Sequence, residues 1–200
     1  MTTITAADVK KLRDQTGAGM MECKNALSEA NGDFEEANTI LRKRGLASAA
    51  KKAGRSANEG LIGQRLSADN SAGTLVEVNC ESDFVARTED FQTLLRELSL
   101  QVAASSPQFV RREDVPAETL ERERSVYRAQ MADSGKPQPV IDKIIEGKLG
   151  SFYEQVCLMD QPSIRDPKQP VHTLLQAAIA KLGENISVAR FVRFKVGESS

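Results

Sequence analysis

The chain has 200 residues, of which 40% are hydrophobic, and its 27 lysines and arginines against 28 aspartates and glutamates leave a formal charge of −1. This length and apolar content suit one domain with an appendage or two small domains. The near balance of charge argues against nucleic acid as the principal ligand, because phosphate binding requires a basic excess.

Cysteine usage and the first residues of the chain indicate a reduced cytoplasm. Cys23, Cys80 and Cys157 are odd in number, far apart and without a CxxC pair, which argues against a zinc ribbon or a disulfide framework. The first residues carry acidic side chains rather than the apolar core of a signal peptide, and the chain lacks an apolar run of about 18 residues. We therefore expect a soluble, cytoplasmic protein without a membrane partner.

Three short helices are predicted near the N-terminus. Thr5 and Asp8 form a capping pattern for the first helix, which ends before the TGAG sequence. The second ends at NGD, where Asp33 and Glu36 cap a third helix that is predicted to stop at Gly45. Helices of about ten residues do not persist alone in water, so the three should pack as a small bundle.

Met20 and Met21 lie side by side in the second predicted helix. Adjacent residues on a helix point in different directions, so a thin bundle cannot easily bury both. Core packing and partner binding are both open for this pair, and we expect one of the two to be exposed, as methionine is at adaptable binding surfaces.

A change of pattern follows the helical region. Residues 46–59, rich in Ala, Lys, Ser and Gly, are predicted to be a linker that is helical at most at its start. The runs GLIGQRL and TLVEVNC then have strand composition and are separated by a hairpin loop, SADNSAG. Val76, Val78 and Cys80 share a face of the second strand, so Cys80 is interpreted as a small buried hydrophobe.

The sequence NCESDFVAR comes directly after this second strand, and a helix with apolar residues at i, i+3, i+4 and i+7 is predicted to begin near Thr88. Ser82, Asp83 and Phe84 therefore fall in the joint between strand and helix. The ring of Phe84 is either part of the core or an anchor presented to a partner, and the pattern leaves both interpretations open.

The remaining chain is predicted to alternate between helices and strands. An exposed, charged helix is expected between Pro116 and Gly135, a short helix around 140–148, a strand at YEQVCLM, and a helix ending at Gly183. The last strand is expected to place five apolar residues on one face: Ile186, Val188, Val192, Phe194 and Val196. This order predicts an α+β fold with helices on one side of the sheet.

Motifs of catalysis are not found. The chain has neither GxxxxGK[ST] nor GxGxxG after a strand, and His172 has no acid or nucleophile close to it in sequence. No set of His, Cys and carboxylate residues has metal-ligand spacing. We therefore expect a binding protein without catalytic residues, cofactor or metal. An unrecognised enzyme and a scaffold that only binds remain as alternatives.

Several segments, in this order, resemble the bacterial-type translation elongation factor Ts family in its short form: LRDQTGAGMMECKNALSEANGDFEEA, VEVNCESDFVAR, SGKP, QPSIRDP, KLGENI and FVRFKVGE. The resemblance covers nearly the whole chain. It implies a guanine-nucleotide exchange factor for elongation factor Tu, with a three-helix domain (1–45) similar to ubiquitin-associated (UBA) domains, a linker (46–59) and an α+β core (60–200). The core should hold a small antiparallel sheet with helices packed on one side.

The resemblance also implies the residues that bind the partner GTPase. The family's Thr-Asp-Phe signature corresponds to Ser82, Asp83 and Phe84, where serine keeps the hydroxyl that caps a helix. The expected contacts to elongation factor Tu are Arg13, Met20, Met21, Ser82, Asp83, Phe84 and Val85. In this interpretation the ring of Phe84 enters the GTPase and disturbs the region that binds Mg²⁺ and phosphate. Short members tend to form homodimers, which we expect to pair through exposed strand edges.

Overall fold

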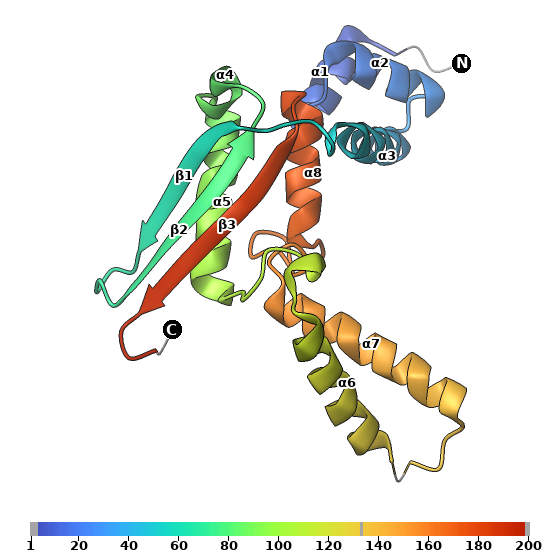
Figure 1. Cartoon of the computed structure of the whole chain (residues 1–200). Helices are drawn as coiled ribbons and strands as arrows, with labels where there is room; N and C mark the ends of the chain where they lie inside the picture. Colours follow the sequence, from blue (N-terminus) through green and yellow to red (C-terminus); the bar gives the residue numbers. More distant parts are fainter. Residues whose placement is uncertain (1–3, 133, 199–200) are drawn as a thin grey trace. The chain divides into compact units, whose positions relative to one another are not determined.

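The structure is a computed structural model that describes residues 4–132 and 134–198 (Figure 1). The elements follow one another as α1 (Ala6–Thr16), α2 (Met20–Glu29), α3 (Phe34–Lys52), β1 (Glu59–Leu66), β2 (Ala72–Cys80), α4 (Asp83–Ala86), α5 (Glu89–Ser105), a 3-10 turn (Arg112–Asp114), α6 (Ala117–Met131), α7 (Gln138–Val156), α8 (Val171–Leu182) and β3 (Ile186–Lys195). The fold is of the α+β class, as the sequence predicts.

Contacts along the chain divide these elements into two compact units. The first unit contains the chain up to Leu61, Val78–Leu95 and Thr173–Ser187. The second contains Ile62–Glu77, Arg96–His172 and the chain from Val188 onward. The N-terminal helices and the segment around Phe84 therefore belong to the same unit.

Helices α1, α2 and α3 form the predicted bundle, which is UBA-like. The backbone N–H of Asp8 donates to the Thr5 hydroxyl over 3.2 Å and the N–H of Thr5 donates to the Asp8 carboxylate over 2.9 Å, which confirms the capping pattern. The bundle encloses one small core: Val9, Leu12, Cys23, Ala26, Leu27, Ala30 and Ala37. Burial of these side chains stabilises helices that are too short to form alone.

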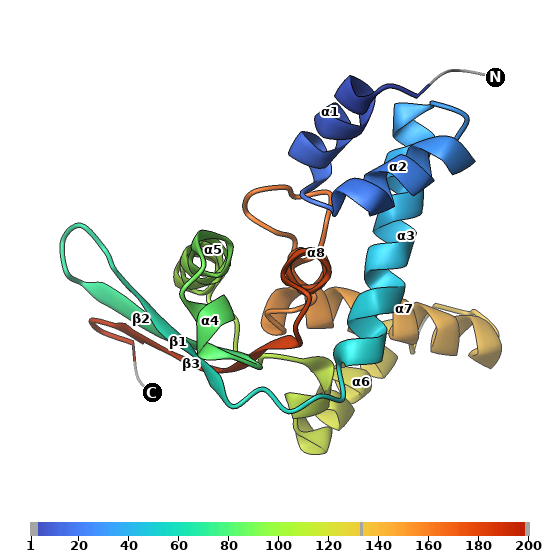
Figure 2. The ribbon, with the colours of Figure 1, turned by 90° about the horizontal axis from the view of Figure 1, so that it is seen from above.

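The predicted end of the third helix at Gly45 is wrong, because α3 continues to Lys52. A Cβ atom added to Gly45 would lie 3.2 Å from the Cβ of Ala180, so the glycine allows α3 and α8 to approach each other closely (Figure 2). Gly45 is thus explained by helix packing rather than by a C-cap. The first part of the expected linker is helical, as foreseen.

The sheet has the strand order β1-β2-β3, and β1 and β2 form the predicted antiparallel hairpin. Val76, Val78 and Cys80 are fully buried, which confirms their shared face and the structural interpretation of Cys80. Helix α5 covers this face of the sheet, whereas no helix of the described residues covers the other face (Figures 1 and 2). At the start of β1, Gly60 has a φ of +150°, and an added Cβ would lie only 2.2 Å from the carbonyl oxygen of Val78.

Strand β3 does not keep its apolar residues on one face, contrary to the sequence prediction. Val188 is buried, whereas Val192 and Phe194 are exposed and the intervening Arg193 is partly buried. The alternation of inward and outward side chains therefore shifts by one residue within the strand. The second half of β3 consequently presents Val192 and Phe194 to solvent.

A second correction concerns YEQVCLM, which is predicted as a strand but lies largely in helix α7. Ile145, Leu149 and Val156 are buried along α7, so a helical spacing continues through this segment. After the helix, Cys157 forms an isolated parallel bridge with Phe109. Helices α6 and α7 pack against each other, and the Lys148 ammonium lies 5.1 Å from the ring centroid of Tyr127.

Candidate partner-binding surfaces

The segment Ser82–Val85 forms a sharp corner between strand β2 and helix α5, as predicted. It contains the single helical turn α4, and the Ser82 hydroxyl accepts a hydrogen bond of 3.4 Å from the Val85 N–H. This bond confirms the capping role expected from serine at this position. The turn continues into α5 through Thr88, whose hydroxyl donates to the Val85 carbonyl over 2.7 Å.

The corner presents Phe84 to solvent. Its side chain is 81% exposed, whereas Cys80 before it and Ala86 after it are buried. The structure thus excludes the core interpretation of Phe84, because a ring this exposed contributes little to its own core. A large apolar side chain presented at a fixed corner is typical of an anchor for a partner.

The neighbours of Phe84 have different environments. The Asp83 carboxylate forms an ion pair of 2.9 Å with the Arg87 guanidinium, one helical turn ahead, and both groups are accessible from solvent. Val85 is partly buried. The ion pair lies at the surface, so it is weak and Asp83 can exchange Arg87 for a partner group at low cost.

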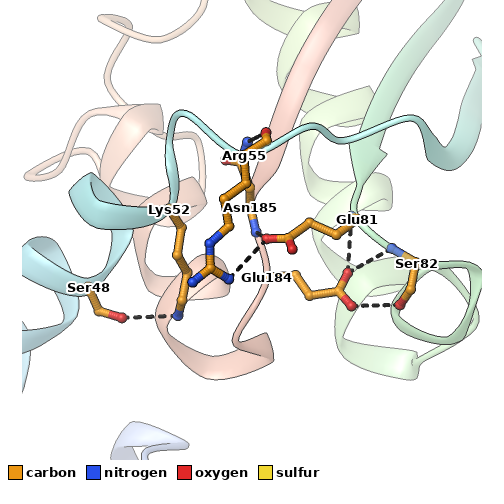
Figure 3. Close-up of polar contacts among 7 residues, drawn as sticks. All are labelled: Ser48, Lys52, Arg55, Glu81, Ser82, Glu184 and Asn185. Carbon is orange, nitrogen blue, oxygen red and sulfur yellow. Dashed lines mark hydrogen bonds and ion pairs between the residues drawn. The ribbon is translucent and has the colours of Figure 1, made fainter.

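Glu184 holds this corner from another part of the chain, a role that the sequence analysis missed. Its Oε2 atom accepts hydrogen bonds from the backbone N–H groups of Glu81 (3.1 Å) and Ser82 (3.0 Å). Its Oε1 atom accepts a bond of 2.6 Å from the Ser82 hydroxyl (Figure 3). The only signal in the sequence is the KLGENI segment, which resembles the family but does not by itself indicate a contact with Ser82.

In a second set of hydrogen bonds, the segment that follows Glu184 is the donor and the segment at Glu81 is an acceptor. The N–H of Asn185 donates to the Glu81 carboxylate over 2.6 Å, and the Asn185 amide donates to the carbonyl oxygen of Arg55 over 2.7 Å (Figure 3). The Arg55 guanidinium lies 3.6 Å from the same Glu81 carboxylate. The linker after α3, the end of β2 and the start of β3 are therefore joined by one polar network.

The thiol of Cys80 lies beside this network. Burial, together with the negative charge of Glu184, raises the pKa of Cys80. A thiol in this state is a poor nucleophile, which supports a packing role.

The N-terminal residues expected to bind the partner are all exposed. Arg13 lies in the last turn of α1, and Met20 and Met21 form the first turn of α2. Met20 is 43% and Met21 is 66% exposed, so both methionines reach solvent where the sequence predicts only one. The residues from α1 and α2 and the corner at Phe84 belong to the same compact unit.

The part of the chain that the structure describes shows few other groups that could bind a metal or act in catalysis. No group of three or more His, Cys, Asp or Glu side chains within residues 4–132 and 134–198 could hold a metal ion. His172 is exposed at the start of α8, with its Nδ1 atom 3.1 Å from the Met159 carbonyl oxygen. Among the described helices, none is long and apolar enough to cross a membrane.

An α+β protein that exposes a phenylalanine at a corner and two methionines on one compact unit is suited to bind another protein. The sequence model of the family Elongation factor TS matches residues 3–198. Elongation factor Ts of Thermosipho melanesiensis is 57% identical over 195 residues, which cover 98% of this chain and 100% of the relative. Elongation factor Ts of Geobacter sulfurreducens is 54% identical over 196 residues, covering 98% and 91%. The chain therefore belongs to the elongation factor Ts family of translation elongation.

Proposed function

We propose that this protein is a guanine-nucleotide exchange factor that binds elongation factor Tu in the cytoplasm and accelerates the release of GDP. The observation that carries this proposal is the exposed ring of Phe84 on a corner that is fixed by hydrogen bonds. The contact residues are Arg13, Met20, Met21, Ser82, Asp83, Phe84 and Val85. The proposal treats the protein as a binding factor, not as an enzyme with its own substrate.

The proposed mechanism acts on the charge balance around GDP. A GTPase holds the diphosphate with backbone amides of its phosphate loop and with Mg²⁺, which neutralises part of the phosphate charge. Phe84 enters an apolar gap of the GTPase and Asp83 binds polar groups beside it, which displaces the elements that position Mg²⁺ and the phosphate loop. The free energy of bound GDP rises, so GDP leaves faster.

Thermodynamic reciprocity then explains how the factor is released. Whatever weakens GDP binding must let GDP weaken the binding of the factor by the same ratio. New nucleotide therefore displaces the factor. The equilibrium between the free GTPase and its nucleotides is unchanged. The factor only increases the rate at which this equilibrium is reached.

The energy available from the ring sets the scale of the effect. Burying one phenylalanine side chain contributes about 1.5–3 kcal/mol. Expressed fully in the transition state, this amounts to about one to two decades in rate. We assign further affinity to the N-terminal domain (1–45), joined by the linker (46–59) to the core (60–200), because two linked contacts on one partner reinforce each other.

The test is the release of fluorescently labelled GDP from elongation factor Tu in a stopped-flow instrument. The protein should accelerate release, and Phe84→Ala should reduce the stimulated rate at least tenfold while the protein remains folded. Val126→Ala, at an exposed valine of α6, is a matched control and should behave as the unchanged protein. A scaffold that only binds would leave the release rate of GDP unaltered, and that result would end the proposal.

We also propose that the protein is a homodimer, and we place the contact on the open face of the sheet rather than on the strand edges. Five apolar side chains of the second unit are exposed there: Ile62, Leu66, Leu75, Val192 and Phe194. They come from all three strands and alternate with residues that face α5, such as Thr74 and Arg193. An exposed apolar sheet face of this kind is typical of a surface that a second molecule covers.

A further inference from the structure

We propose that Glu184 is a positioning residue for nucleotide exchange, because its carboxylate fixes the direction in which Phe84 leaves the protein. This inference rests on the proposed function of Phe84. Glu184 itself need not touch the partner. Its role is to hold the backbone from which the aromatic ring projects.

By itself, the corner at Ser82–Val85 is weakly held. Helix α4 has only four residues, which is too short to be stable without external contacts. The bond from Val85 to its N-cap Ser82 measures 3.4 Å and is therefore a weak one. The ring of Phe84 is exposed and cannot orient the turn by packing.

Glu184 makes a strong contact with this corner. One carboxylate accepts hydrogen bonds of 3.1, 3.0 and 2.6 Å from two consecutive backbone N–H groups and the Ser82 hydroxyl. Bonds to an ionised acceptor are stronger than those between neutral groups. These bonds use residues directly before α4, so they determine where the turn begins and how it is rotated.

Glu184 is itself held in place by its neighbours. It follows Gly183, which ends helix α8 with a φ of +80°, and it precedes the buried Asn185. Asn185 binds back to the Glu81 carboxylate over 2.6 Å and to the Arg55 carbonyl oxygen over 2.7 Å. The segments at Glu81 and Glu184 thus bind each other reciprocally, and the carboxylate of Glu184 has a rigid support (Figure 3).

The consequence for exchange is entropic. A ring on a loosely held turn must be ordered when it enters the partner, and this ordering reduces the free energy left for displacing the nucleotide. A corner held by Glu184 has its ring oriented before binding. Removing the carboxylate should therefore slow exchange through Phe84 and through no other residue.

The experiment is a double-mutant cycle on the full chain, read by the rate of labelled GDP release at saturating concentration of the factor. Glu184→Ala should slow stimulated release by about tenfold, which corresponds to about 1.4 kcal/mol. In a Phe84→Ala background the same change should have no further effect on the rate, although it lowers the melting temperature equally in both backgrounds. A purely structural residue would not show this loss of effect.

Two further variants keep the test decisive if Glu184→Ala does not fold. Glu184→Gln keeps the size of the side chain and one oxygen for the two N–H groups, so it should retain most of the activity. Ser82→Ala removes only the 2.6 Å bond and should give an intermediate rate. Glu118→Gln, at an exposed carboxylate of α6, is the matched control and should not change the rate.

The outcomes separate the inference from the proposed function. If Phe84→Ala slows release but Glu184→Ala and Ser82→Ala do not, the inference is wrong and the proposed function stands. An equal effect of Glu184→Ala in both backgrounds also overturns the inference, since Glu184 would then act independently of the ring. If the Phe84→Ala variant stimulates GDP release at the same rate as the unchanged protein, Phe84 has no role in exchange and this inference is wrong as well.

Discussion

Met20 and Met21 are neighbours in the first turn of α2, and both reach solvent. The core of the bundle includes small residues such as Cys23 and Ala26 beside Leu12 and Leu27. Methionine adapts its shape to irregular surfaces, so the pair suits a contact that supplies affinity. Phe84, in contrast, is presented on a short turn held by polar atoms.

This difference predicts separate kinetic effects. Replacing Met20 and Met21 by alanine should weaken the affinity for elongation factor Tu by about tenfold, the scale of an interface residue that matters for binding. The rate of GDP release at saturating factor should stay unchanged, because the ring of Phe84 still acts in the complex. The measurement is the rate of release against factor concentration, with Thr39→Ala on the exposed side of α3 as the control. A fall in the maximal rate would contradict this division of roles.

The cysteines allow a prediction on chemical reactivity. Cys23, Cys80 and Cys157 are free and fully buried, and burial raises the pKa of Cys157 from 9.0 to about 11. Because the thiolate is the reactive form, a thiol reagent at pH 8 should label none of the three quickly in the folded protein and all three in guanidinium. One rapidly reacting thiol in the folded protein would contradict the structure.

The same shift has a consequence for stability. A folded pKa above the unfolded value means that the unfolded state loses its proton first as the pH rises. The contribution of Cys157 is therefore complete below about pH 9 and is lost as the pH approaches 11. Unfolding by urea at pH 8 and pH 10.5, compared with Cys157→Ala, measures this difference.

At the scale of elements, a glycine can be required because another part of the chain packs closely against it, and not because it ends a helix or strand. Gly60 combines a φ of +150° with a carbonyl oxygen 2.2 Å from the position of an added Cβ. Gly60→Ala should therefore lower the free energy of unfolding by at least about 2 kcal/mol, through backbone strain and the clash together. Gly54→Ala, at a position with no atom within 4 Å of the added Cβ, is the matched control. Equal denaturation midpoints for the two variants would show that the start of β1 is not held as described.

The capping bonds between Thr5 and Asp8 predict how the stability of the protein changes in acid. The hydrogen bond from the Thr5 hydroxyl, followed by the bond from the Thr5 backbone, lowers the pKa of Asp8 below its ordinary value of 3.8. A lowered pKa means that Asp8 stabilises the folded state fully above pH 3.8 and that this contribution is lost as the pH falls through the folded value. Asp8→Ala should therefore be less stable than the unchanged protein at pH 6, with the difference shrinking towards pH 3. Urea titrations at both pH values test this, and a constant difference would exclude a role for the charge.

At the scale of the whole molecule, the open sheet face determines the expected assembly. Phe194 is 66% exposed, and it lies on the same outer face as Ile62 and Leu75. An aspartate placed at Phe194 would have to lose its hydration in a face-to-face dimer, which costs far more free energy than in a monomer. Phe194→Asp should therefore convert the dimer to a monomer in analytical ultracentrifugation.

The matched control for this experiment is Val126→Asp, an equally drastic change at an exposed valine of α6. This variant should remain a dimer, because α6 is not part of the outer sheet face. If Phe194→Asp still forms dimers, the strand edges become the better location for the contact.

The sequence alone was sufficient wherever a structure depends on neighbouring residues. The capping box of Thr5 and Asp8, the end of the second helix before NGD, the hairpin loop and the apolar spacing of α5 are all local patterns, and the structure confirms them. The position of Phe84 between strand and helix was also predictable. These features depend on hydrogen bonds and periodicities within a few residues, which the sequence displays directly.

Tertiary structure decided the features that depend on distant contacts. Gly45 continues a helix because it packs on Ala180, and Tyr153–Val156 remain helical because α7 buries Val156. The direction of Phe84 depends on Glu184, which is distant in sequence and which local patterns cannot pair with Ser82. A side chain becomes an anchor only when its backbone is held and its ring is left uncovered, and both conditions are set by the packing of the folded chain.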